Sequence, residues 1–166
     1  YRFQSSSTSH SKFNPDSLNI NRRLYTLVGI GGAKQDNPIG SKRYPVWGIS
    51  GEVTWPSRPF QRFGIGLDLM HDGSNKENLK SEGIPVHADI DVTRIGANIR
   101  YEFQVGRASI NLGIGPYIYR LDKTGGPVYE RLALRYFFAQ NIFGQIALKT
   151  HWGNADYVEY GLGIRL

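Results

Sequence analysis

The sequence predicts an all-β protein, an eight-stranded antiparallel transmembrane β-barrel. From residue 24 onward, apolar and polar residues alternate with a period of two over eight segments, which is typical of strands whose two faces meet different surroundings. The connections between segments are mostly short at one end and longer at the other, as in outer-membrane barrels. The chain holds 20 glycines and 10 tyrosines, and helical periodicity is almost absent.

The segments follow one another in a simple order. Residues 1–21 are rich in serine and asparagine, so we expect a flexible N-terminal tail before a barrel domain at residues 22–166. In segment 92–103, Ile95 and Ile99 share one face while Arg94 lies on the other. The first segment is the least clear, because both of its faces carry apolar residues. The strands are expected near residues 24–33, 46–55, 63–69, 92–103, 108–119, 129–138, 142–152 and 157–166.

The connections between these strands alternate in length. Short ones are expected near residues 56–62, 104–107 and 139–141, and longer ones near 34–45, 71–90 and 122–127. The connection near residues 153–156 is short and breaks this trend. Strand alternation alone also fits a soluble lipocalin-like barrel, in which the apolar face points inward and the charged face meets water.

Two features of the polar face favour the membrane barrel. Its glycines leave room for long side chains in the narrow interior of an eight-stranded barrel, and its charges of both signs can pair there. The aromatic residues near the short connections resemble an interfacial girdle; they are Trp55, Phe60, Phe63, Tyr101, Phe103, Tyr136 and Phe138. We expect an interior polar network formed by Glu52, Asp68, Arg94, Arg100, Glu102, Arg131, Arg135, Lys149 and Arg165.

The composition excludes several other classes of protein. The chain has no cysteines, which rules out disulfides and thiolate chemistry, and no apolar run reaches the ~18–20 residues of a membrane-spanning helix. The net charge of +6 has no local cluster that suggests nucleic-acid binding. The four histidines are scattered without metal-ligand spacing, so we expect no metal and no cofactor. The chain starts at Tyr1, and we expect a removed signal peptide and a location in the bacterial outer membrane.

The ending ALKTHWGNADYVEYGLGIRL carries a family resemblance. It resembles the outer-membrane lipid A 3-O-deacylases, or acyloxyacyl hydrolases, of the divergent Bacteroidetes-type branch. In that family a His-x-Ser-Asn motif supplies base and nucleophile, and a glutamate on the last strand orients the histidine. The resemblance assigns His151 and Asn154 to the motif and Glu159 to the orienting acid. The serine position, however, is occupied by Gly153, so the family's nucleophile is missing.

Strand parity raises a second objection to catalysis. By alternation, His151 and Glu159 point into the barrel, whereas an enzyme acting on membrane-embedded lipid A needs its site on the outer wall; a β-bulge would change this parity. We therefore expect a non-catalytic structural or accessory barrel in which His151 and Glu159 are hydrogen-bonded inside the mouth, near Lys149. The alternative is a lipid A ester deacylase that uses both residues with a relocated nucleophile, or with water activated by His151.

Other stretches suggest binding rather than chemistry. The sequence HDGSN at residues 71–75 is expected to form an Asp-Gly turn and not a triad. The basic residues of the longer loops face the outer leaflet in this topology and can contact the phosphates of lipopolysaccharide; they are Lys34, Lys42, Arg43, Lys76 and Lys80. The expected partners are thus outer-membrane lipids, lipopolysaccharide among them, and a protein partner that docks on the tail, the loops or the outer wall.

Overall fold

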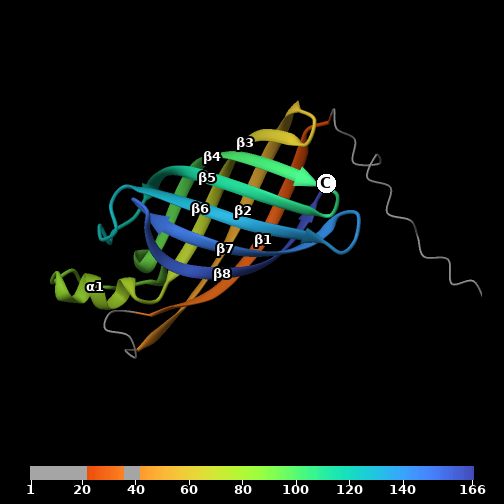
Figure 1. Ribbon diagram of the computed structural model, residues 1–166. Coiled ribbons are helices and arrows are strands. Elements are labelled where there is room, and N and C mark those ends of the chain that lie inside the picture. The colour runs from red at the N-terminus through yellow and green to blue at the C-terminus, as the bar shows by residue number, and fades with distance from the viewer. Residues whose placement is uncertain (1–21, 36–41) are drawn as a thin grey trace, which may run out of the picture.

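Eight antiparallel strands close into a barrel in chain order, as the computed structural model shows (Figure 1). The structure describes residues 22–35 and 42–166, and the tail expected at residues 1–21 lies outside them. The predicted fold class is confirmed. The strands are β1 (Leu24–Gln35), β2 (Arg43–Arg58), β3 (Gln61–Asp72), β4 (Thr93–Val105), β5 (Ala108–Tyr119), β6 (Val128–Phe137), β7 (Ile142–His151) and β8 (Asn154–Arg165).

Alternation of side chains between the two faces determines what lies inside. In β5, whose predicted range of 108–119 matches the structure, buried and exposed residues alternate from Ala108 to Pro116, because successive side chains of a strand point to opposite faces. The two apolar faces of β1 also have an explanation. Val28 and Ile30 point inward and pack against Phe137 and Phe143, forming the apolar part of the interior.

The long β3–β4 connection forms a cap at the loop end of the barrel (Figure 1). It contains the helix α1 (Asn75–Ser81) and a 3-10 turn η2 (Asp89–Val92), neither of which the sequence patterns predicted. Leu79 of α1 is fully buried, and the Asn75 side chain donates a hydrogen bond to the Val92 carbonyl. The expected turn at residues 71–75 is more ordered than a loop: β3 runs to Asp72, whose carboxylate accepts a 2.7 Å hydrogen bond from the Ser74 hydroxyl.

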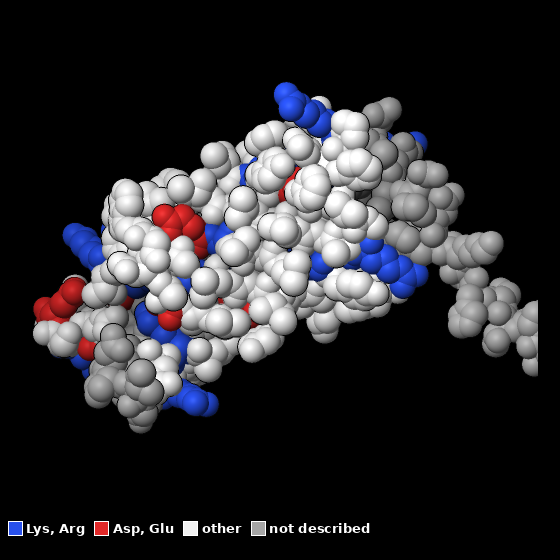
Figure 2. Space-filling model, viewed as in Figure 1, with Lys and Arg blue, Asp and Glu red and all other residues white. Residues whose placement is uncertain are grey.

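The outer wall is apolar. Leucine, isoleucine and aromatic side chains of all eight strands are exposed on it, and Figure 2 shows a middle band with few charged residues, which gather toward the ends. Near the short connections, Phe60, Phe63 and Tyr136 are more than half exposed, as expected for an interfacial girdle. Within the described ranges, no helix has the length and apolar character needed to cross a membrane.

Candidate functional site

A tight hairpin joins β7 to β8 and contains the motif. His151 pairs with Asn154 in the ladder, so Trp152 and Gly153 form a two-residue turn. Both turn residues have positive φ, 52° and 77°, as a type I′ hairpin turn requires. Glycine adopts this backbone region without strain, whereas other residues lose about 1–2 kcal/mol there. Glycine is therefore the residue type that this turn favours at position 153.

A β-bulge follows directly on β8. Thr150 pairs with Ala155 and Lys149 pairs with Tyr157, which leaves Asp156 as an extra residue in the ladder. A bulge of this kind re-aims a side chain. Here it turns Asp156 toward the interior, while Tyr157 beyond it is buried as well.

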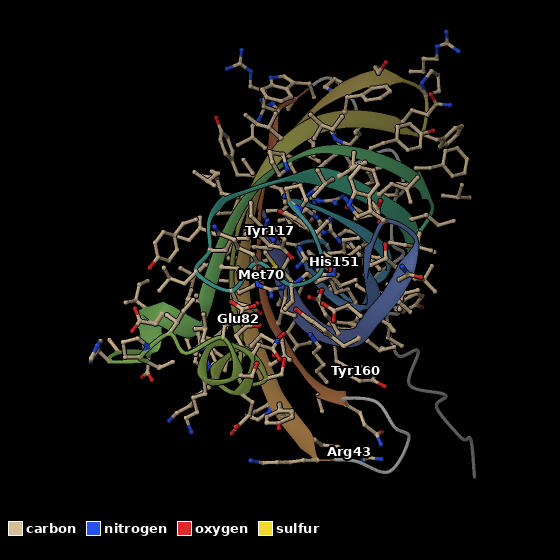
Figure 3. All side chains as sticks on the ribbon, turned by 90° about the vertical axis from the view of Figure 1, so that its left-hand side faces the viewer. Arg43, Met70, Glu82, Tyr117, His151 and Tyr160 are labelled. Atoms are coloured by element: carbon tan, nitrogen blue, oxygen red, sulfur yellow. The ribbon has the colours of Figure 1, made fainter. Side chains whose placement is uncertain are left out.

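His151 lies inside the mouth of the barrel and is 7% exposed. Its Nε2 is 2.6 Å from the hydroxyl of Tyr117 on β5, and its Nδ1 is 3.3 Å from Oδ2 of Asp156. Figure 3, a view into the loop end, shows His151 and Tyr117 within the ring of strands. The contact with Asp156 is electrostatic and not a hydrogen bond, because Oδ2 of Asp156 has no hydrogen-bond partner among the residues that the structure describes. In the contact with Tyr117, the donor and acceptor roles of the two groups depend on the tautomer of His151.

The prediction that His151 contacts Glu159 is wrong. Glu159 pairs in register with Ala147, several residues deeper in the barrel than His151. The Glu159 carboxylate pairs instead with the guanidinium of Arg131. Its Oε2 lies 2.8 Å from Nε of Arg131, and its Oε1 accepts a 3.1 Å hydrogen bond from Nη2. Asp156 takes the place beside His151 that the resemblance gave to Glu159. Asn154 is exposed at the start of β8.

The β5–β6 loop covers this site from above. Gly125 and Gly126 both have positive φ and lie against the rings of His151 and Trp152, so closely that a Cβ on either glycine would come within 3.3 Å of those rings. A cavity of about 370 Å³ remains at the hairpin. It is lined by Gly125, Gly126, His151, Trp152, Asn154, Ala155 and Asp156.

The mouth is held together by ion pairs. Asp156 lies 2.9 Å from Nζ of Lys34 and 3.9 Å from Nζ of Lys149, and Lys34 also reaches Asp72 at 3.3 Å. The Lys34 side chain is only 16% exposed. The prediction that Lys34 contacts lipid phosphates is therefore wrong, because its charge is already paired inside the barrel.

The other four basic residues lie at the loop end of the barrel, at or just before the start of β2 and in α1. Arg43, Lys76 and Lys80 are exposed. Lys42 is also exposed and lies 4.0 Å from Glu77. At this separation and exposure the pair contributes little, so the charge of Lys42 stays available to other anions.

Asp122, in the β5–β6 loop, links the cap to the barrel. It accepts hydrogen bonds from Arg94 at 2.5 Å and from Asn78 of α1 at 3.2 Å. Burial alone would raise the pKa of Asp122, but the backbone N–H of Thr124 and the guanidinium of Arg94 outweigh burial and hold it below its ordinary value. The ionised carboxylate thus connects the cap, the loop and β4.

The nine residues expected in the interior network are all buried inside the barrel. Three arginines and three carboxylates alternate in a continuous chain of contacts of 2.5 to 2.9 Å, in the order Arg135, Glu52, Arg100, Asp68, Arg131 and Glu159. Nearer the turn end, Arg165 pairs with Glu102 at 2.5 Å. Near the mouth, Lys149 has a different environment, with its Nζ 3.1 Å from the Tyr157 hydroxyl and over the rings of three tyrosines.

The arrangement supports hydrogen bonding more readily than nucleophilic attack. A phenol, an imidazole and a carboxylate lie next to one another, and the half-buried phenol of Tyr117 packs against the rings of Tyr129 and His151. A base at Nε2 would first have to release Tyr117. Within residues 22–35 and 42–166, no group of three or more His, Cys, Asp and Glu side chains could hold a metal ion.

Sequence analysis missed the two side chains that contact His151. Tyr117 could have been found, because it continues the inward parity of Gly113 and Gly115 along β5. Asp156 could not, because strict alternation places it on the outer face and only the bulge brings it inward.

The comparisons with known proteins agree with this architecture. No curated protein matches the chain. A solved structure described as "De novo design of transmembrane beta-barrels" is similar over 88% of this chain and 97% of that one, with a TM-score of 0.52 and 11% sequence identity. At this identity the similarity concerns the fold alone.

Family membership rests on a separate finding. The family model described as "Acyloxyacyl hydrolase, C-terminal domain" matches residues 23–166, which include the whole barrel and the hairpin with its His151 motif. Together with the transmembrane barrel fold, this match indicates an outer-membrane protein. The chain belongs to the acyloxyacyl hydrolase family.

Proposed function

We propose that this chain is a non-catalytic member of its family, a structural or accessory barrel of the bacterial outer membrane. The observation that carries the proposal is the hairpin turn. Position 153, where the family has its nucleophile, is a glycine in the left-handed region of a two-residue turn, and His151 points away from the lipid into the barrel mouth.

The surroundings of His151 support the same conclusion. Nε2 of His151 is hydrogen-bonded to the Tyr117 hydroxyl, Nδ1 faces the Asp156 carboxylate at 3.3 Å, and Gly125 lies against the ring. Catalysis of acyl transfer needs a hydroxyl beside the base and open to the substrate. Here the hydroxyl beside the base is half-buried and faces the interior of the barrel, and the polar mouth gives an acyl chain no apolar path to it. In this role the exposed loop cations (Lys42, Arg43, Lys76 and Lys80) would contact anionic lipids such as lipopolysaccharide, and a protein partner would dock on the loops or the wall.

One observation favours the alternative, an ester hydrolase acting on lipid A. The Tyr117 hydroxyl, His151 and Asp156 form a hydroxyl–imidazole–carboxylate line, which would supply a relocated nucleophile. Tyr117 oxygen would attack the ester carbonyl while His151 takes its proton, and that proton would pass to the leaving alcohol. Water would then hydrolyse the acyl-tyrosine, with Asp156 stabilising the imidazolium in both steps. Asp156 would thus act in place of Glu159.

Mass spectrometry of lipid A separates the two functions. The full chain, folded in detergent, is incubated with lipid A beside His151→Ala, Tyr117→Phe and an active family member as positive control. We expect no loss of an acyl chain with any form of this protein while the positive control removes one. Loss of a chain in the wild type that disappears in both variants would contradict the proposal and establish the tyrosine mechanism.

A further inference from the structure

A groove on the lipid-facing wall ends at an unusual pair of polar side chains. It has a volume of about 570 Å³ and lies on the outer faces of β3 to β7. Two rows of residues, paired in register from strand to strand, form its rims. The turn-side row is Phe63, Tyr101, Leu112, Leu132 and Leu148, and the loop-side row is Ile99, Ile114, Glu130 and Thr150.

The floor of the groove exists because of inward-facing residues. Gly64, Arg100, Gly113 and Arg131 lie between the two rows and pair with one another in register. Their side chains, where they have any, point into the barrel, so only backbone lies between the rims. On the outside, Ile99 is 66% exposed and Leu132 is 48% exposed, and both offer apolar surface to a neighbouring chain.

The dimensions of the groove suit one acyl chain. Four strand-to-strand steps of ~4.8 Å give a length of roughly 19 Å. The groove begins at Phe63, the third residue of β3 at the turn end, and finishes at Thr150, the last but one residue of β7 at the loop end. With strands tilted by ~45°, it rises by roughly 13 Å along the barrel axis, about the thickness of one leaflet's hydrocarbon layer.

The upper end of the groove carries a negative charge. Oε2 of Glu130 accepts hydrogen bonds from the Thr150 hydroxyl at 2.6 Å and from the Gly153 amide at 3.3 Å. Both partners are neutral, so the carboxylate keeps its charge on the outer wall and Oε1 remains open to a further donor. A carboxylate facing lipid is costly unless a donor or a cation meets it. The Thr150 hydroxyl and the Gly153 amide together hold Glu130 in one orientation at the end of the apolar path.

From this geometry we propose that the groove binds one acyl chain of an outer-leaflet lipid whose headgroup carries a primary ammonium, which donates to Glu130. The rims and floor of the groove would hold the acyl chain, and the Glu130 carboxylate would favour headgroups that carry a primary ammonium. A primary ammonium offers three N–H donors and a positive charge, and its hydrogen bond to a carboxylate is of the strong, charge-assisted kind. This binding does not depend on whether the protein is catalytic.

A second groove on the same wall provides an internal comparison. It has a volume of about 880 Å³ and lies on the other side of the row that contains Ile99 and Ile114. Its outward-facing residues are Tyr25, Gly51, Val53, Ile65, Leu67, Ala97, Ile99, Ile114 and Pro116, and none carries a charge. An acyl chain can lie there too, but nothing in that groove distinguishes one headgroup from another.

Native mass spectrometry of the full chain in detergent tests the proposal. The probes are phosphatidylethanolamine and phosphatidylcholine with identical chains, since the choline ammonium has the same charge but no N–H donor. We expect the wild type to retain phosphatidylethanolamine roughly fivefold more than phosphatidylcholine, the factor for a half-exposed ion pair. Glu130→Gln should bring the ratio close to one, and Glu130→Asp should keep a preference.

Two matched variants locate the bound lipid. Leu148→Trp narrows the groove that ends at Glu130 and should reduce the retention of phosphatidylethanolamine. Ala97→Leu narrows the second groove and should leave the preference for phosphatidylethanolamine over phosphatidylcholine unchanged. A shift in gel mobility between unheated and heated samples, equal to that of the wild type, shows that each variant is folded. Equal retention of the two lipids by the wild type, or a preference that survives Glu130→Gln, would overturn the proposal. So would a dimer of the chain that Leu148→Trp abolishes, because a second copy would then occupy the groove.

Discussion

Replacing Arg131 by methionine tests whether the interior ion pairs determine the stability of the barrel. Arg131 is 2% exposed and lies between two carboxylates, with Nη1 2.8 Å from Asp68 and Nε 2.8 Å from Glu159. In Arg131→Met, Asp68 keeps Arg100 at 2.9 Å. Glu159 loses the partner that the structure shows for it. Since removing one member of a buried pair costs about 3–5 kcal/mol, we expect the free energy of unfolding to fall by that amount.

The double variant Arg131→Met/Glu159→Gln distinguishes an uncompensated charge from lost packing. A neutral amide at position 159 removes the buried charge while keeping its shape, so we expect the double variant to be more stable than Arg131→Met by about 2 kcal/mol. Urea titration of the protein in lipid vesicles, followed by tryptophan fluorescence and gel mobility, measures both differences. A single-variant loss below ~1 kcal/mol, or no recovery in the double variant, would refute the reasoning.

Two further predictions concern close packing and the cap. A Cβ at Gly115 would come within 1.9 Å of the Ala97 carbonyl oxygen, whereas one at Gly51 would meet nothing within 4 Å. In the same urea titration, Gly115→Ala should lower the free energy of unfolding by ~1–3 kcal/mol and Gly51→Ala should hardly change it. Equal losses in the two variants would contradict this prediction. The pKa of Asp122 is lower in the folded protein than in the unfolded chain. Asp122 therefore stabilises the fold at pH values above its unfolded pKa of about 3.9, and this contribution is lost as the pH falls through the lower pKa of the folded protein. Hydrogen exchange in α1, corrected for intrinsic rates, should therefore accelerate in strongly acidic solution, and Asp122→Asn should exchange faster already at pH 7; a variant that behaves like the wild type would show that Asp122 does not hold the cap.

Most of the barrel could be predicted from the sequence because a single rule, strand parity, sorts its side chains. The rule placed charged residues such as Glu52 and Arg135 on the inward face, where they are buried. It could not supply the pairing, because partners such as these lie 83 residues apart in the chain and their contact depends on the shear of the closed barrel. The helix α1 was missed since its seven residues are too few to show helical periodicity.

The candidate site was predictable only in part, because its geometry departs from regular alternation. His151 was placed correctly inside the barrel by parity, but its carboxylate partner was not, since the bulge after the hairpin re-aims Asp156. One irregular residue is enough to change which acid stands beside the histidine. Position in a family motif identified Glu159, yet register assigns it to the deeper network of Arg131.

The hairpin also determines how position 153 lies relative to His151. In a histidine-x-serine motif on one continuous strand, the two side chains are two residues apart and share a face. In this chain β7 ends at His151 and the backbone turns at Trp152 and Gly153, so position 153 no longer continues the face on which His151 lies. A hydroxyl there would sit in the turn and not beside the imidazole. The two-residue turn thus separates position 153 from the face on which His151 lies, and Tyr117 and Asp156 are the side chains that contact the imidazole.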